Sequence, residues 1–543
     1  MKKTNLVITI IVVSISLFLS LFVLFTPIPQ NSETEFSAVK AAEYISVLSN
    51  DPHSVLDEEA HEEVRLYIKN QLIEFVGVSN VEEMNYTKEE LGEDTDYGIQ
   101  NLLATIPGNS ETGILLVAHY DSRGNIGRDG ELGRSYGAAD DGYGLAVLLE
   151  VARLFADQTL ENSIYILVTD AEEVGLYGAV MAAQEQELMD KIGFVINIEA
   201  RGTEGAAYMF ETSRNNELVI DFYRNANLPV TYSVATAVYA VMPNSTDFSE
   251  FLKADKQGAN FAVLDGFYNY HTPLDNYTNI SLTSIQHYGE QIIPLVSEFT
   301  SNTIYSDVNY FVGTQDQVFF TILPNVLIAY TDTFGTVMNI ILIVAFIALI
   351  VVLQKKKQII PMKILKYTGV IFLFIVVAVI IGLVVSQIAA FLGKTTWNVT
   401  YVRMQGTEIP TLLSMVGVIT LFAFIFKKKY VLKEDKMAFM LAGIGINLVF
   451  ALLTGLVLSG ASFLFFVPAL FGLISLYVLS FVKNRTLNTI TLSQNIIWNI
   501  LIFVPLLYSL FLALTIGGLL ALLLLLVIAL SVVIPSVFIQ LNL

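Results

Sequence analysis

The chain of 543 residues contains no cysteine. That absence excludes disulfide bonds, cysteine-ligated zinc fingers, iron–sulfur centres and thiol catalysis. It is also more typical of a bacterial protein than of a large eukaryotic lumenal domain. Histidine is scarce, and all 5 histidines precede residue 290. The remainder of the chain therefore cannot hold a His-Glu-x-x-His metal site or a Ser–His catalytic pair.

Basic side chains are few in the first part of the chain. Residues 1–310 carry 45 acidic and 16 basic side chains, a balance of −29. Phosphate binding needs clustered lysine and arginine, so nucleic acid is not expected as a partner. The simpler explanation of so acidic a surface is that it keeps the domain soluble.

What the sequence has in abundance is apolar residues. They make up 54% of the chain, and the mean hydropathy is +0.60, which is too apolar for an ordinary soluble enzyme. The run Leu6–Phe25 is about as long as the ~20 residues that cross a bilayer. It is followed by Thr26-Pro27-Ile28-Pro29 rather than by a small-residue cleavage site, so we expect an uncleaved anchor. Further spans are predicted near residues 335–354, 366–392, 409–426, 437–458, 462–482, 494–513 and 517–540.

Lysine-rich loops predict the orientation of these spans. Lysine and arginine cluster at residues 355–366, 427–436 and 483–485, in alternate loops, whereas Lys394 and Arg403 stand alone in a loop of the other side. By the positive-inside rule the lysine-rich loops and both termini are cytoplasmic. Eight spans satisfy this pattern and place residues 30–333 outside. The expected location is a bacterial plasma membrane, with the lipid bilayer as a partner.

The predicted spans carry no Asp, Glu, His, Lys or Arg away from their ends. Such groups are the usual mark of ion or proton pathways. The main strongly polar groups in the spans are Asn447, Asn499 and Gln387, and hydrogen bonds between helices explain them. We therefore interpret the membrane half as an anchor or substrate-presenting platform rather than a transporter or an intramembrane protease.

Four domains are predicted. They are a cytoplasmic stub and anchor (1–29), an extracytoplasmic domain (30–310), a membrane-surface connector (311–333) and a membrane domain of about seven helices (334–543). The apolar stretch 318–331 within the connector is too short to span a bilayer and is interrupted by Pro324.

Strand and helix patterns alternate in the extracytoplasmic domain. Strands are predicted at Gly113–His119, Ser163–Thr169 and Phe194–Ile198, and helices at Gly142–Phe155 and Leu176–Gln186. This alternation is typical of an α/β sheet covered by helices on both faces. A ligand site is expected at the carboxyl ends of its strands.

Histidines and acids recur in short motifs at or after these strands. The motifs are His119-Tyr120-Asp121, Gly137–Gly142 (GAADDG), Asp170–Leu176 (DAEEVGL), Glu199-Ala200-Arg201-Gly202 and His271–Asp275 (HTPLD). Imidazole and carboxylate are zinc ligands. A carboxylate that bridges two ions holds them ~3.5–4 Å apart and makes a shared water reactive near neutral pH.

These residues suffice for a pair of zinc ions. His119 and His271 would each bind one ion, and Asp140 would bridge the pair. Glu173 would complete one site and Glu199 the other.

Two further acids receive catalytic roles. Glu172, beside a ligand but free itself, would take a proton from the water and pass it to the leaving amine. Asp121 would hydrogen-bond the second nitrogen of His119 and fix its tautomer.

Each residue also has an ordinary structural explanation. Asp140 and Asp141 precede a helix, where aspartate is a common N-cap. Glu172 and Glu173 suit the first turn of a helix. The joint occurrence of the motifs, in order and near strand ends, favours the metal site. The other histidines are assigned structural roles: His53, His61 and His287.

In this order the motifs resemble those of the co-catalytic di-zinc aminopeptidase family, which includes secreted bacterial aminopeptidases, glutamate carboxypeptidase and the transferrin-receptor ectodomain. The resemblance covers roughly residues 37–305. It implies a zinc-exopeptidase-like mixed sheet flanked by helices, beside the N-terminal transmembrane anchor and an all-α multi-span membrane domain. It also implies two Zn²⁺ ions per chain.

A closer likeness is to the membrane-bound subgroup of endoplasmic reticulum metallopeptidases and vacuolar membrane proteases. These also join this domain to a multi-span region, and they share a Pro-His near the start, here Pro52-His53. Glu199 stands where soluble aminopeptidases have an aspartate, and it can still coordinate zinc. Asp247 matches a pocket segment of the family. The resemblance also implies an oxyanion-stabilising tyrosine, for which the candidates are Tyr232, Tyr239 and Tyr268.

The leading hypothesis is a membrane-anchored zinc exopeptidase, an aminopeptidase that hydrolyses peptides outside the cytoplasm. Two alternatives stay open. One is a non-catalytic receptor or scaffold on the same fold, although such relatives typically lose ligands. The other is a glutaminyl-cyclase-like acyl transferase that works with a single zinc.

Overall fold

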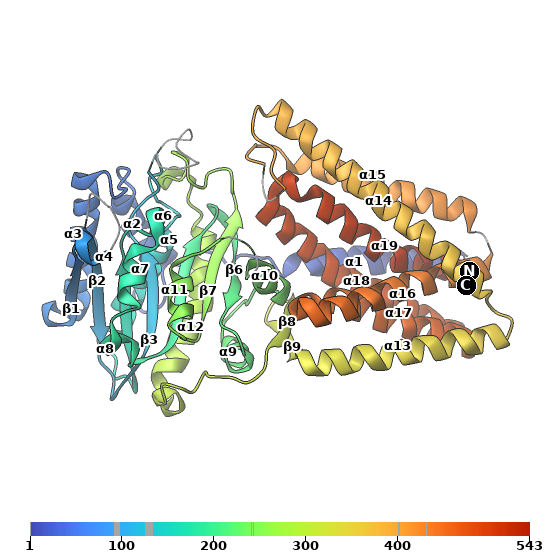
Figure 1. Cartoon of the computed structure of the whole chain (residues 1–543), viewed down its shortest axis with the longest axis horizontal. Coiled ribbons are helices and arrows are strands. Elements are labelled where there is room, and N and C mark those ends of the chain that lie inside the picture. The colour runs from blue at the N-terminus through green and yellow to red at the C-terminus, as the bar shows by residue number, and fades with distance from the viewer. Residues whose placement is uncertain are drawn as a thin grey trace. The chain divides into compact units, whose positions relative to one another are not determined.

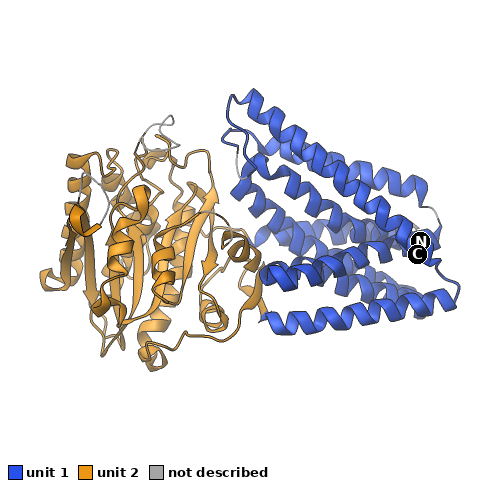
Figure 2. Cartoon of the chain, in the orientation of Figure 1, with its two compact units in different colours: residues 1–23, 330–543 blue, residues 24–329 orange. Residues whose placement is uncertain are grey.

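The computed structural model describes residues 2–91, 98–124, 134–240, 242, 244–399, 402–430 and 432–542. It divides into two compact units, residues 24–329 and residues 1–23 with 330–543 (Figure 2). The second unit is discontinuous in sequence, because its first helix precedes the whole of the other unit.

Residues 24–329 are built on a sheet that has seven strands within the described part of the chain, in the order β1-β2-β4-β3-β5-β7-β6 (Figure 1). The strands are β1 (Val81–Tyr86), β2 (Ile99–Ile106), β3 (Ser110–His119), β4 (Asn162–Thr169), β5 (Ile192–Ala200), β6 (Glu204–Thr212) and β7 (Gly258–Asp265). The four central strands, β4, β3, β5 and β7, are parallel, and the pairings outside them are antiparallel. The predicted mixed α/β sheet is thus confirmed.

Helices cover both faces of this sheet. Ile114 and Leu116 of β3 belong to a core shared with α2, α3, α5 and α12, whereas Leu115 and Val117 belong to a second core shared with α7, α8 and α11. Successive side chains of a strand point to opposite faces, so an unbroken apolar run is what a strand buried on both sides requires. The helices are α2 (Ala38–Leu48), α3 (Glu58–Val76), α4 (Lys88–Leu91), α5 (Gly142–Phe155), α6 (Glu172–Gly175), α7 (Tyr177–Ala182), α8 (Gln186–Met189), α9 (Glu217–Tyr223), α10 (Ser233–Tyr239), α11 (Asp247–Lys253) and α12 (Leu282–Ser301). Short 3₁₀ turns are η1 (Val78–Asn80), η3 (Tyr277–Asn279) and η4 (Thr303–Ser306).

One predicted helix is shorter in the structure, and one region forms strands that were not predicted. The helix expected to reach Gln186 ends at Ala182, because the exposed residues 184–187 have no apolar side chain to place on the sheet until Leu188. The connector, for which no secondary structure was predicted, forms a two-stranded sheet of β8 (Gln317–Leu323) and β9 (Val326–Thr331). Asn325 between these strands has a φ of 60°, a left-handed conformation that asparagine tolerates at turns.

The other unit consists of long helices. They are α1 (Lys2–Phe22), α13 (Asp332–Lys355), α14 (Pro361–Leu392), α15 (Glu408–Lys429), α16 (Lys433–Val457), α17 (Phe463–Phe481), α18 (Arg485–Leu514) and α19 (Leu519–Gln540), with 3₁₀ turns η5 (Ser459–Ala461) and η6 (Thr515–Gly518). Seven helical stretches of the described residues are long and apolar enough to cross a membrane. The last of them, Arg485–Gln540, contains both α18 and α19. These helices identify an integral membrane protein.

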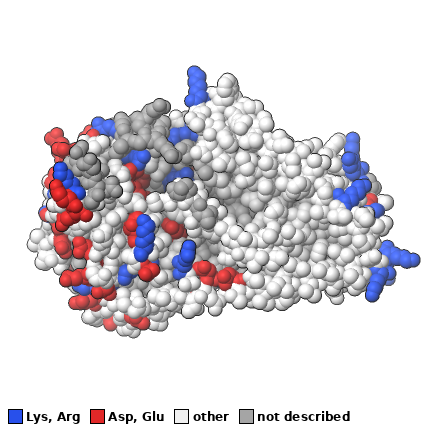
Figure 3. All heavy atoms as spheres, in the orientation of Figure 1, with Lys and Arg blue, Asp and Glu red and all other residues white. Residues whose placement is uncertain are grey.

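Charged side chains are distributed unequally between the two units. On the face drawn in Figure 3 the acidic side chains gather on residues 24–329, whereas the surface of the helical unit is mostly uncharged. Basic residues lie in the last turns of α13 (Lys355) and α15 (Lys427, Lys428 and Lys429). Within this unit small residues allow close helix contacts. A Cβ on Gly382 of α14 would lie 2.6 Å from the Cα of Leu520, and one on Gly443 of α16 would lie 2.6 Å from the carbonyl oxygen of Ser531. Such contacts are typical of packed membrane helices.

Candidate metal centre

The predicted ligands lie at the carboxyl ends of the parallel strands. His119 is the last residue of β3, and Glu199 is the last residue but one of β5. Glu173 lies in α6 immediately after β4, and Asp140 lies just before α5. His271 follows β7 in a loop, with a φ of 56°. Four separate connections thus converge on one edge of the sheet, as the topology of parallel strands dictates.

These side chains form two groups that share one carboxylate. His119, Asp140 and Glu199 form one group, and Asp140, Glu173 and His271 form the other, with the candidate ligand atoms of each group within 4.8 Å of one another. The Nε2 of His119 lies 3.4 Å from Oδ1 of Asp140, and the Nε2 of His271 lies 3.2 Å from Oδ2 of the same residue. The two oxygens of Asp140 therefore face different groups.

The donor set fits zinc. The Nε2 of His119 and the Oε1 of Glu173 are buried and make no hydrogen bond to a residue that the structure describes. Buried polar atoms are rarely left in that state. Each group offers one imidazole and two carboxylates, which is a set that zinc accepts while keeping a position open.

The second ring nitrogen of His119 lies close to two oxygens of Asp121. This nitrogen, Nδ1, lies 2.9 Å from the backbone carbonyl oxygen of Asp121 and 3.5 Å from the carboxylate. The carboxylate of Asp121 instead accepts the backbone N–H groups of Glu172 and Glu173, at 2.9 and 3.1 Å. Asp121 therefore positions His119, chiefly through its own backbone carbonyl, and Glu172 and Glu173 through its carboxylate.

Arg123 is a positioning residue that the sequence analysis did not identify. Its Nη1 donates to the backbone carbonyl of Glu173 and, at 3.2 Å, to Oε2 of the same residue. This leaves Oε1 of Glu173 directed at His271, 3.0 Å from its Nε2. The only signal in the sequence was the place of Arg123, two residues after Asp121.

Asp275 joins two ligand segments. It is fully buried, and its carboxylate accepts the backbone N–H of Ala139 at 2.7 Å and that of Asp140 at 3.2 Å. The hydroxyl of Ser135 donates to it at 3.3 Å. Asp141, next to the shared ligand, caps α5 through the N–H of Gly144. The capping alternative thus applies to Asp141 and leaves Asp140 free to face the histidines.

Buried asparagines support Glu199. Asn197 and Asn260 are paired across β5 and β7, and the Nδ2 of Asn197 donates at 3.1 Å both to Oε1 of Glu199 and to Oδ1 of Asn260. Asn260 in turn donates to Oε2 of Glu211 at 3.0 Å. Burial raises the pKa of Glu211 to about 7. No motif pointed to these residues.

The acids of the centre titrate far from their ordinary values. Burial raises the pKa of Glu172 well above its usual range, and the nearby charge of Glu199 adds to this. Burial likewise raises the pKa of Glu199 to about 8 against the opposing effect of His119. For Asp140 burial is outweighed by His119 and His271, which hold the pKa below its usual range. Burial raises the pKa of Asp247 to about 7. Such a cluster of shifted groups marks a functional site.

The three tyrosine candidates occupy different surroundings. Tyr232 is buried, and its hydroxyl makes no hydrogen bond within the described part of the chain. Burial raises the pKa of Tyr239, and the nearby charges of Glu211, Glu199 and Glu172 raise it further. Tyr268 is 36% exposed.

Tyr270 was not predicted, but it contacts the centre directly. Its ring stacks on that of His271 with 3.7 Å between centroids. Burial raises the pKa of its hydroxyl, and the charges of Asp140 and Glu173 add to this.

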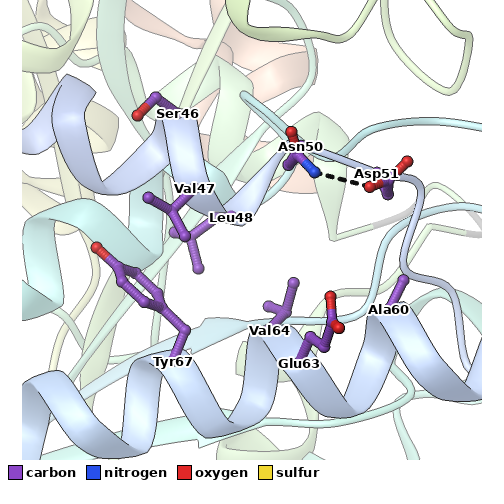
Figure 4. A pocket seen from close by; sticks show the side chains of 9 residues that line it. All are labelled: Ser46, Val47, Leu48, Asn50, Asp51, Ala60, Glu63, Val64 and Tyr67. Carbon is purple, nitrogen blue, oxygen red and sulfur yellow. Dashed lines mark hydrogen bonds between the residues drawn. The ribbon is translucent and has the colours of Figure 1, made fainter.

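The three other histidines have hydrogen-bond partners away from the two groups. Nδ1 of His53 lies 2.9 Å from the carbonyl of Asp51, and Nε2 of His61 lies 3.0 Å from Asp170. The N–H of Ala207 donates to Nδ1 of His287. A cavity of about 290 Å³ between α2 and α3 is also separate from the centre (Figure 4). Its lining contains none of the predicted ligands and consists of Ser46, Val47, Leu48, Asn50, Asp51, Ala60, Glu63, Val64 and Tyr67.

Residues 24–329 therefore form an α/β domain with buried histidines and carboxylates at the carboxyl edge of a mixed sheet. Residues 101–296 match the family model of peptidase family M28. This match confirms the resemblance inferred from the motifs.

Curated relatives include endoplasmic reticulum metallopeptidase 1 of Mus musculus, 29% identical over 245 residues, which are 44% of this chain and 26% of that protein. The vacuolar membrane protease of Candida dubliniensis is 32% identical over 220 residues, or 39% of this chain and 22% of that protein. The match thus spans about a quarter of the length of these relatives.

Among solved structures, a glutaminyl cyclase from Bacteroides thetaiotaomicron is similar with a TM-score of 0.38 and 19% identity, covering 49% of this chain and 99% of that one. A Zn-dependent exopeptidase from Parabacteroides distasonis has a TM-score of 0.38 and 18% identity, with the same coverage.

Proposed function

We propose that the domain of residues 30–310 is a zinc-dependent exopeptidase, an aminopeptidase, which hydrolyses peptides on the extracytoplasmic side of a bacterial plasma membrane. The single observation that supports this most is the pair of three-residue groups that share Asp140. One shared carboxylate between two half-sites is the arrangement of a two-metal hydrolytic centre.

The ligands in this proposal are those predicted from the sequence. His119 and Glu199 would hold one zinc ion, and Glu173 and His271 would hold the other, with Asp140 shared between the two groups. Bound there, the ions would polarise the scissile carbonyl and lower the pKa of the attacking water.

Glu172 is the proposed general base. It belongs to neither ligand group, and its backbone is fixed by the hydrogen bond from its N–H to Asp121. Its carboxylate takes a proton from the attacking water and then gives it to the amine that leaves, which is the behaviour of a carboxyl with a raised pKa. Asp121 and Arg123 act as positioning residues, because both contact the chain segment that carries Glu172 and Glu173.

The membrane helices serve in this proposal as an anchor or a platform, with both termini in the cytoplasm. The loops carrying the lysine clusters then face the cytoplasm. Peptide substrate reaches the centre from outside.

The experiment uses the full chain purified in detergent. We expect two zinc ions per chain by elemental analysis and hydrolysis of unblocked peptides but not of N-blocked ones. Glu172→Gln should keep the zinc and reduce kcat by about 10²–10⁴-fold. Glu187→Gln, an exposed glutamate on α8, is the matched control and should retain activity.

Other results would identify other functions. A chain that binds no zinc would favour a receptor or scaffold. One zinc per chain together with cyclisation of N-terminal glutamine would indicate an acyl transferase. Unchanged peptide hydrolysis by Glu172→Gln would refute the assignment of the base.

A further inference from the structure

Arg201 is held at the edge of the metal centre by the backbone of β5. The pairing with β7 continues one residue past the strand, since the N–H of Arg201 donates to the carbonyl of Val263 at 2.9 Å. The next residue, Gly202, approaches β7 so closely that a Cβ there would lie 2.1 Å from the carbonyl oxygen of Asp265. Alternate residues of an extended strand share a face, so Arg201 is on the same side as Glu199.

The guanidinium group lies on an aromatic surface. Its Cζ is 5.1 Å from the centroid of the Phe267 ring, and Phe267 is only 7% exposed. The Phe267 ring stacks on that of Tyr270 at 5.9 Å, and Tyr270 stacks on His271 at 3.7 Å. A continuous row of rings thus joins Arg201 to a proposed zinc ligand. The whole path is under about 15 Å, a length that about four extended residues span.

The guanidinium group of Arg201 makes no hydrogen bond or ion pair to any residue that the structure describes. In contrast, Arg123 donates to Glu173, and Arg153 pairs with Glu150 at 2.7 Å. Arg201 as a residue is half-buried, and its charge acts on both Tyr239 and Tyr270. Five N–H donors in a fixed fork are therefore available beside a centre that is otherwise rich in carboxylates.

We propose that Arg201 binds a carboxylate of the peptide substrate close to the scissile bond. This rests on the proposed peptidase function and adds a substrate class to it. The planar fork of arginine matches a carboxylate with two parallel hydrogen bonds. The carboxylate has two possible sources within the available length. One is the free C-terminus of a peptide of up to about four residues, and the other is an acidic side chain near the cleaved bond.

Matched peptide pairs distinguish the two sources. Ala-Ala-Ala is compared with its C-terminal amide, and Ala-Glu-Ala-amide with Ala-Gln-Ala-amide, on the zinc-loaded full chain. A charged hydrogen-bonded pair corresponds to about ten- to hundredfold in kcat/KM, so the wild type should prefer the carboxylate-bearing member of one pair by that factor. In Arg201→Gln that ratio should fall towards one, and Arg201→Lys should restore only part of it.

Arg214→Gln provides the matched control. Arg214 is exposed and lies just after the last residue of β6. That end of β6 pairs with the first residues of β7, so Arg214 is at the edge of the sheet opposite to the metal centre. The change in net charge is the same, so a general electrostatic effect would lower the ratio in both variants. Equal zinc content of Arg201→Gln and wild type would show that the centre itself is intact. An unchanged ratio in Arg201→Gln refutes the proposal.

Binding separates this inference from the proposed function. Affinities of the free and amidated peptides are measured by calorimetry on Glu172→Gln and on the double variant with Arg201→Gln. Suppose that the wild type hydrolyses no peptide, and that Glu172→Gln binds the free peptide more tightly than the amide whereas the double variant does not. The proposed peptidase function is then wrong, and the carboxylate site at Arg201 stands. If the wild type hydrolyses peptides but neither hydrolysis nor binding depends on Arg201, the site is wrong and the function stands.

Discussion

Replacing Asp275 with asparagine should weaken zinc binding without removing a ligand. Asp275 accepts two backbone N–H groups, those of Ala139 and Asp140, and both oxygens are needed for this. Asparagine keeps the shape but offers one oxygen and one NH₂ group. One backbone N–H would therefore face another donor inside a fully buried site.

The magnitude follows from the hydrogen bonds that change. A hydrogen bond to a charged group contributes roughly 1.5–3 kcal/mol, and a buried N–H left without a partner costs roughly 1–3 kcal/mol. Part of this cost lowers the free energy of unfolding, and part loosens the segment that carries Asp140. Groups that orient metal ligands typically change metal affinity by about 10–100-fold. Because Asp140 belongs to both ligand groups, the weakening should extend to both ions.

Competition with a chromophoric chelator measures this effect on the full chain. Asp275→Asn should lose zinc at about 10–100-fold lower chelator concentration than wild type, and excess zinc should restore its peptidase activity. Asp157→Asn is the matched control, because Asp157 is exposed after the far end of α5. Zinc affinity equal to that of wild type in Asp275→Asn would refute the view that this carboxylate holds the shared ligand in place.

Two further predictions concern stability. Burial lowers the pKa of His287 to about 4, and its Nδ1 accepts the N–H of Ala207 at 2.8 Å, so the folded state requires a neutral ring. The stability that the neutral ring contributes is present above the unfolded pKa of about 6.5 and is lost as pH falls towards 4, by on the order of 3 kcal/mol. The unfolding temperature of chelator-treated His287→Gln should therefore fall less steeply with acid pH than that of wild type. An equal fall in both proteins would contradict the assignment. In the membrane unit, Gly443→Val would overlap Ser531 and should cost roughly 1–3 kcal/mol, lowering the unfolding temperature in detergent. Gly417→Val, with no atom within 4 Å, should change that temperature little, and similar losses in both would show that valine itself, not the contact, is responsible.

The sequence predicted those parts of the fold that depend on local patterns. The helix at Gly142–Phe155 was predicted with its observed bounds, because an aspartate cap and a helical apolar period coincide there. The strands leading to His119 and Glu199 were found because parallel strands buried on both faces read as short apolar runs. Convergence at one edge then followed from the topology, without any knowledge of side-chain positions.

What could not be predicted depends on contacts between distant segments. Asn197 and Asn260 meet only because of the register between β5 and β7, and register between strands is not contained in either strand's own pattern. The contact of the Asp121 carboxylate with His119 was predicted, but for the same reason its bonds from the N–H groups of Glu172 and Glu173 were not. Backbone donors are present at every residue, so no motif reveals which of them a carboxylate will choose.

The discontinuity of the helical unit affects how the chain is assembled. α1 packs beside α18, and Asn5 donates to the backbone carbonyl of Gln540 at 2.9 Å. Roughly 460 residues separate α1 from α18 in sequence. At about 5–20 residues per second the synthesis of these intervening residues takes on the order of a minute. During that time α1 exists without its final neighbour, while the unit of residues 24–329 folds between two segments of one bundle. That domain is consequently attached to the bundle through both of its ends, and a single cut in either connection would leave it bound to the membrane.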